Sequence, residues 1–166
     1  MKIRLMMLGL LLLLPLASAA QEIEANVVRY GANLYEIVGR DLFIATEYCF
    51  EGAEQADILL KLDESGNQMQ FKKSGNSCDI QMVYGRSQLD PGEYDFAVSR
   101  DDEGWYGIDG QDAAFKTTGC YSFAENVAAK IIMEEGGKGS LVIPSEDEEC
   151  RIEGVYGKTE LQVVKE

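Results

Sequence analysis

The chain has 166 residues, of which 46% are hydrophobic, and 29 acidic residues against 15 basic ones give it a net charge of −14. A surface of that sign repels phosphate backbones and anionic head groups, so nucleic acid and membrane surfaces are excluded as expected partners. The sequence contains no histidine, which excludes Ser-His-Asp, Cys-His and other histidine-based catalysis.

Residues 1–20 have the pattern of a secretory signal peptide. Two basic residues, Lys2 and Arg4, precede an apolar run over 5–16, and small residues follow at 17–20. This run is too short to span a bilayer as a mature helix, and no cysteine follows the expected cleavage site to carry a lipid anchor. We therefore expect an exported, soluble protein, located in the periplasm or the medium, with no membrane insertion.

The rest of the chain repeats itself. Residues 22–54 align without a gap on 93–125, and eleven of these 33 positions are identical, where chance gives roughly one in fifteen. Residues 78–89 match 150–161 in the same way, with six identities in twelve positions. We interpret the pattern as a tandem duplication of one small folding unit.

The repeat divides the mature chain into unit 1 at 21–90 and unit 2 at 91–166. The join at Asp90-Pro91-Gly92 is typical of a turn, because Pro fixes φ and Gly accepts either sign of φ. Such a join is too short for a flexible linker, so we expect the two units to be in contact.

The local patterns of unit 1 are those of strands. Residues 35–37 and 42–49 flank a predicted turn at Gly39-Arg40, and residues 58–62 and 69–73 flank a second turn. The segment 78–84 then alternates Ile80, Met82 and Tyr84 on one face. These patterns predict antiparallel hairpins.

Unit 2 carries one ambiguous segment. Residues 123–135 contain helix formers, whereas the aligned residues of unit 1 have the pattern of a strand. We expect a short helical turn after the first cysteine of each unit, followed by a strand. The predicted fold is mainly β: two copies of a disulfide-stapled antiparallel unit, each with five or six strands.

Four cysteines are available to staple these units. They are Cys49, Cys78, Cys120 and Cys150, and an exported chain is expected to form two disulfides from them in one of three connectivities. If a single ancestral unit folded before it was duplicated, its two cysteines most simply bonded each other. This favours the pairs Cys49–Cys78 and Cys120–Cys150. Without histidine or a Cys-x-x-Cys spacing, a metal site is not expected.

Residues that both units keep are expected to form the scaffold, and function is expected where the units differ. The largest differences are two acidic clusters in unit 2. Trp105 in place of Leu34 and Phe123 in place of Gly52 suggest either an aromatic anchor on unit 2 or, for the single Trp, a core position. These clusters are either solvated loop tips or a site for a basic partner, and no EF-hand pattern points to calcium. The candidate partner-binding residues are Asp101, Asp102, Glu103, Trp105, Glu146, Asp147, Glu148 and Glu149.

No catalytic motif accompanies these residues. Gly-x-Ser-x-Gly is absent, and the Gly-rich stretch 136–140 lacks the spacing of a phosphate-binding loop. We expect a non-catalytic binding or inhibitory protein without a cofactor, which engages a basic protein or peptide. The alternative is a structural or assembly module of the cell envelope that acts through exposed β edges. The sequence leaves the oligomeric state open.

Overall fold

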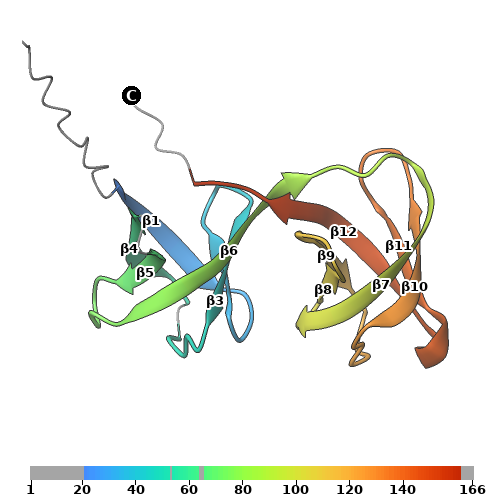
Figure 1. The fold of residues 1–166 in the computed structure, drawn as a ribbon, viewed down its shortest axis with the longest axis horizontal. Coiled ribbons are helices and arrows are strands. Elements are labelled where there is room, and N and C mark those ends of the chain that lie inside the picture. Colours follow the sequence, from blue (N-terminus) through green and yellow to red (C-terminus); the bar gives the residue numbers. More distant parts are fainter. Residues whose placement is uncertain (1–20, 53, 64–65, 162–166) are drawn as a thin grey trace, which may run out of the picture.

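The computed structural model describes residues 21–52, 54–63 and 66–161, so the predicted signal peptide at 1–20 lies outside the described residues. The described chain folds mainly into strands (Figure 1). Its first half contains β1 (Gln21–Arg29), β2 (Leu34–Ile37), β3 (Leu42–Glu47), β4 (Ala56–Asp63), β5 (Gly66–Phe71) and β6 (Ser77–Ser87). Its second half contains β7 (Gly92–Asp102), β8 (Trp105–Ile108), β9 (Ala113–Thr118), β10 (Val127–Met133), β11 (Gly139–Ile143), the short 3₁₀ turn η1 (Pro144–Glu146) and β12 (Glu148–Lys158).

The first six strands close into an antiparallel barrel. Their neighbours follow the cyclic order β1-β2-β3-β6-β5-β4, and β4 pairs with β1 to complete the ring. Strands β7 to β12 pair in the order β7-β8-β9-β12-β11-β10, and β10 returns to β7. Closure gives each of these strands a neighbour on both sides. The predicted mainly β, antiparallel fold is confirmed.

The predicted helical turns are wrong, but the strand expected after the second of them is present. Residues 121–126 form no helix, and neither do the described residues after Cys49, 50–52 and 54–55. Strand β10 instead places Ala129, Ile131 and Met133, at every second position, in the buried core. This two-residue period suits a strand with one buried face, so burial in the barrel outweighs the local helix propensity. The strand predicted for this segment is confirmed.

One disulfide staples each barrel. Cys49 bonds Cys78, with their Cα atoms 5.4 Å apart, and Cys120 bonds Cys150, with Cα atoms 5.2 Å apart. The predicted connectivity is therefore confirmed, and two disulfides are typical of a protein in an oxidising, exported environment. Among the described residues, no helix is long and apolar enough to cross a membrane.

The two barrels meet at a seam with its own buried core. The seam core combines Leu34, Phe43 and Tyr84 of the first barrel with Trp105, Ala114 and Tyr156 of the second. The ring centroid of Trp105 lies 4.9 Å from that of Phe43, 5.1 Å from that of Tyr156 and 5.4 Å from that of Tyr84. Strands β6 and β12 also pair across the seam. The barrels are therefore in direct contact, and an aromatic cluster holds them together.

A polar network covers one side of this cluster. The Tyr156 hydroxyl donates to the Asp41 carboxylate at 2.6 Å, and the Arg86 guanidinium donates to the Tyr156 oxygen at 3.1 Å. Arg86 also donates to the Glu153 carbonyl at 3.0 Å. Burial, and then the hydrogen bond to Asp41, raise the pKa of Tyr156 to about 12. The network thus links residues of both barrels around a protonated tyrosine.

Candidate functional site

The structure separates the two predicted acidic clusters. Asp101, Asp102, Glu103 and Trp105 lie at the β7–β8 turn beside the seam, whereas residues 146–149 lie at the β11–β12 turn. Among the described residues, no hydrogen bond or ion pair joins one cluster to the other. The candidate residues therefore do not form a single site.

In the second cluster, at residues 146–149, Glu148 has a structural role. Its carboxylate accepts the backbone N–H of Tyr121 at 2.6 Å and that of Ser122 at 3.0 Å, and it also accepts the Ser122 hydroxyl. Desolvation raises the pKa of Glu148, but these hydrogen bonds outweigh it and leave the pKa below its usual value. Glu148 thus fixes the β9–β10 loop, while Glu146, Asp147 and Glu149 remain exposed to solvent.

Glu148 also lies beside the second disulfide, close enough to group with Cys120 and Cys150 as candidate metal ligands. The two sulfurs are bonded to each other, so neither is available as the thiolate that a metal requires. This group of residues is therefore part of the scaffold of the second barrel.

At the first cluster, the seam opens into a pocket of about 430 Å³. Its floor is apolar, since Leu34, Tyr84 and Trp105 are buried and Met82 is half-buried. Its rim carries the exposed polar residues Asn33, Gln81 and Asp101 and the half-buried Asp102. The pocket is lined by Asn33, Leu34, Ala45, Thr46, Gln81, Met82, Tyr84, Asp101, Asp102 and Trp105. This volume lies within the range of small-molecule and side-chain sites.

Asp102 connects the two barrels at the rim of the seam pocket. Its carboxylate accepts the backbone N–H of Glu103 at 2.8 Å and, over a longer 3.4 Å, that of Asn33 in the first barrel. Gly31 is needed opposite this carboxylate, because a Cβ at that position would collide with it. Asp102 is therefore held in place by both barrels, with its charge at the seam.

The Asp101 carboxylate is less constrained than that of Asp102. Among the described residues it has no hydrogen-bond or ion-pair partner. Its side chain reaches solvent, yet it packs against Gly107, and partial desolvation together with the charges of Asp109 and Asp102 raises its pKa. The rim therefore carries a concentration of negative charge that a bound cation would relieve.

The same negative charge acts on the floor of the pocket. Burial, and then the charges of Asp101 and Asp112, raise the pKa of Tyr84 to about 12. Trp105 is only 1% exposed and packs in the seam core, so it forms part of the floor and is not an exposed anchor. The arrangement suits a ligand with an apolar part for the floor and a cationic group for the rim.

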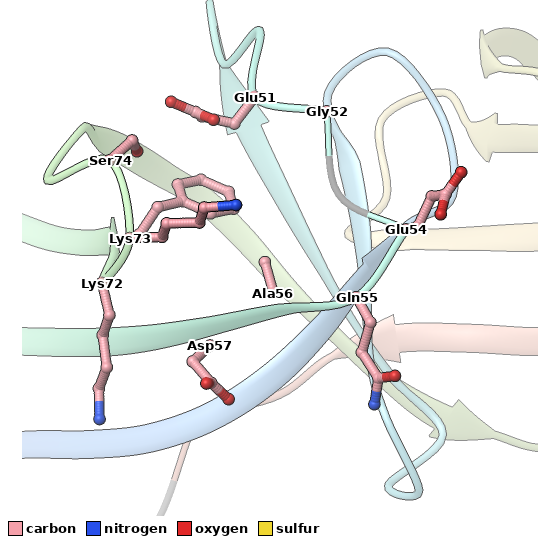
Figure 2. Close-up of a pocket in the computed structure, with 10 residues that line it drawn as sticks. Glu51, Gly52, Glu54, Gln55, Ala56, Asp57, Lys72, Lys73 and Ser74 are labelled. Atoms are coloured by element: carbon pink, nitrogen blue, oxygen red, sulfur yellow. The ribbon is translucent and has the colours of Figure 1, made fainter.

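Sequence reasoning missed a second and larger pocket, of about 720 Å³, at one end of the first barrel. Figure 2 shows the carboxylates of Glu51, Glu54 and Asp57 pointing in different directions around it. Lys72, which also lines it, is paired with Glu24 at 2.7 Å. Its charges do not converge on one point, and so the pocket suggests no particular chemistry.

Sequence reasoning also missed the contribution of the first barrel to the seam pocket. Leu34, Gln81, Met82 and Tyr84 line the pocket, whereas the sequence pointed to function only where unit 2 differs from unit 1. Tyr84 aligns with Tyr156, and both belong to the seam core. The tyrosines that both units share were the available sequence signal for this side of the pocket.

No family model, curated protein or solved structure matches this chain.

Proposed function

We propose that this protein is a non-catalytic binding or inhibitory protein, and that its seam pocket receives a cationic segment of a peptide or protein partner. The observation that carries the proposal is the pair Asp101 and Asp102 at the rim of an apolar pocket, with no ion-pair partner among the described residues. The net charge of −14 supports it, because an acidic surface speeds encounter with a basic partner.

The geometry favours a lysine or arginine side chain as the ligand over a small inorganic cation. A metal ion requires several oxygen ligands converging on one point, whereas the buried floor of Leu34, Tyr84 and Trp105 offers mostly apolar surface. Long basic side chains cover apolar surface with their stems and keep the charge at the rim. A peptide with an apolar residue next to a basic one suits the pocket equally well, because the apolar side chain covers the floor and the charge stays at the rim.

The proposal includes export and an origin by duplication. The basic and apolar pattern of residues 1–20 supports removal of a signal peptide, and the two disulfides suit secretion to the periplasm or the medium. Three likenesses between the barrels support the duplication: the same cyclic strand order, a register shift at Thr46 and at Thr117, and one disulfide each.

The alternative, an assembly module that acts through exposed β edges, has less support. Each of the twelve strands in the described part of the chain has at least two pairing partners. A free edge long enough to add a strand from another chain is the requirement of that mode. The seam pocket needs no such edge.

The test is binding of the dipeptide probe acetyl-leucyl-arginine amide, followed by the fluorescence of Trp105, the one tryptophan of the chain. We expect weak binding, with a Kd on the order of 1 mM. Asp101→Asn, which removes a charge but no hydrogen bond of the fold, should weaken binding about two- to fivefold. Replacing the arginine of the probe with neutral citrulline should weaken it similarly.

A control variant and a pH titration make this result specific. Glu135→Gln removes an exposed charge at the β10–β11 turn, away from the seam, and should leave the affinity unchanged. Because the pKa of Asp101 is raised, acidification should weaken binding at a higher pH than an ordinary aspartate would. Equal affinity for the arginine and citrulline probes would contradict the proposal.

A further inference from the structure

Four large aromatic side chains stand out on the described surface. Tyr48 is 77% exposed, Phe50 79%, Tyr121 73% and Phe123 90%. Tyr48 and Phe50 flank Cys49 in the β3–β4 loop, and Tyr121 and Phe123 follow Cys120 in the β9–β10 loop. Both loops lie along the lower edge of the molecule in Figure 1. Each barrel thus carries two exposed aromatic residues in a loop at this edge.

The backbone of the first loop is held firmly while its rings face solvent. Besides the Cys49–Cys78 disulfide, the buried Tyr35 hydroxyl donates to the Glu51 carbonyl at 2.8 Å. Tyr48 has a φ of 52°, a left-handed conformation that is unfavourable for a bulky residue. The surrounding contacts therefore fix a loop conformation that keeps the aromatic rings out of the core.

The second loop is held in the same manner. The Tyr106 hydroxyl donates to the Ser122 carbonyl at 2.9 Å, the Cys120–Cys150 disulfide anchors its start, and Glu148 binds the N–H groups of Tyr121 and Ser122. A preformed aromatic surface loses little conformational entropy when a partner binds. Both loops therefore have the properties of a binding surface that is ordered in advance.

Hydrogen bonds link each loop to the edge of the seam pocket, the first loop directly and the second through Arg100. On one side, the Cys49 N–H donates at 3.2 Å to the side-chain oxygen of Asn33, which lines the pocket. On the other, Arg100 donates to the Tyr121 carbonyl at 3.0 Å and to the carbonyl of pocket residue Asp102 at 3.3 Å. Its guanidinium lies 4.9 Å from the centroid of the Phe123 ring. The pocket thus lies between the two aromatic loops.

We propose that the two aromatic loops and the seam pocket form one docking surface for a basic protein segment that carries apolar side chains on both sides of a lysine or arginine. This inference rests on the proposed function and extends it from one pocket to the whole partner surface. The surrounding charge selects the partner, because Glu47, Glu51 and Glu54 adjoin the first loop and Asp101 and Asp102 lie between the loops. An anionic membrane would be repelled by this charge.

The experiment is selection of a random dodecapeptide library on the wild-type protein, followed by titration of the enriched peptides. We expect enrichment of sequences with lysine or arginine between leucine, phenylalanine or similar residues. The double variant Tyr48→Ser/Phe50→Ser and the double variant Tyr121→Ser/Phe123→Ser should each lower the affinity at least tenfold. All four side chains are exposed, so both variants should fold.

Val38→Ser is the matched control, because Val38 is an exposed hydrophobic residue, 44% exposed, outside both loops. It should leave the affinity unchanged. Enrichment of acidic or uncharged peptides, or unchanged affinity in both loop variants, would overturn the docking surface. Aromatic-dependent binding to vesicles of phosphatidylcholine and phosphatidylglycerol would overturn the choice of partner.

The two proposals can fail separately. If Asp101→Asn weakens peptide binding and the loop variants do not, the docking surface is wrong and the seam pocket stands. If the loop variants weaken binding and Asp101→Asn has no effect, the cation site in the pocket is wrong and the loops alone bind the partner.

Discussion

Replacement of Trp105 by alanine is expected to reduce the free energy of unfolding by roughly 3–5 kcal/mol, the usual cost of deleting a fully buried large aromatic side chain. Trp105 is 1% exposed and its ring packs against Phe43, Tyr84 and Tyr156. Two of these three rings belong to the other barrel, so the substitution removes contacts that join the barrels. Urea denaturation followed by circular dichroism measures the loss.

The form of the unfolding transition carries further information. If the seam couples the barrels, the wild-type protein should unfold in one transition and Trp105→Ala should separate it into two or lower its m-value. Phe123→Ala is the control, because Phe123 is exposed and its loss should change stability by no more than about 0.5 kcal/mol. A loss below about 1 kcal/mol for Trp105→Ala would contradict the packed seam.

Removal of one disulfide is expected to cost about 3.5 kcal/mol in the chain-entropy model, since each bridge closes a loop of similar length. The sequence separations are 29 for Cys49–Cys78 and 30 for Cys120–Cys150. The double variant Cys120→Ser/Cys150→Ser and the double variant Cys49→Ser/Cys78→Ser should therefore lose similar amounts. Urea denaturation of each variant gives the comparison.

A third pair of substitutions tests the connectivity itself. Cys49→Ser/Cys120→Ser also removes two cysteines, but it breaks both bridges and should cost roughly twice as much as either matched pair. Equal losses for all three double variants would argue against the connectivity within each barrel. Peptide mapping under non-reducing conditions should recover the same two pairs.

Much of the fold was predictable because its signals are local. The alternation of Ile80, Met82 and Tyr84 predicts a strand whatever the place of that strand in the fold. The aligned cysteines favoured pairing within each half. The helical turns were wrong for a related reason. Helix propensity is also local, whereas the backbone groups of Tyr121 and Ser122 form hydrogen bonds with the side chains of Tyr106 and Glu148, which come from distant strands.

The site was predictable only in part, because it depends on contacts between distant segments. The sequence singled out Asp101, Asp102 and Trp105, but their meeting with Leu34 and Tyr84 follows from the packing of the barrels. Glu148 illustrates the opposite case. Its position in an acidic run suggested a partner site, whereas hydrogen bonds from three donor groups of Tyr121 and Ser122 hold its carboxylate against the loop.

Comparison of the two units singled out Phe123, but the exposure of the other three loop aromatic residues could not be recognised from residue type. Phe50 and Tyr121 follow a buried cysteine directly, a position where an aromatic residue suits a core equally well. Their exposure follows from the path of the chain after each disulfide, and the left-handed conformation of Tyr48 has no signature in the sequence. Geometry therefore decides between core and surface at these positions.

Binding of a cation at the seam can be mapped directly by two-dimensional ¹H–¹⁵N NMR during a titration with acetyl-leucyl-arginine amide. The chain has one tryptophan, so its single indole N–H signal reports on the pocket floor. We expect the largest shifts at the Trp105 indole and at the amides of Asn33, Gln81 and Asp101, with smaller shifts in Asp101→Asn. Shifts confined to other surfaces, or an unchanged spectrum at probe concentrations of about 10 mM, well above the expected Kd, would contradict the claim.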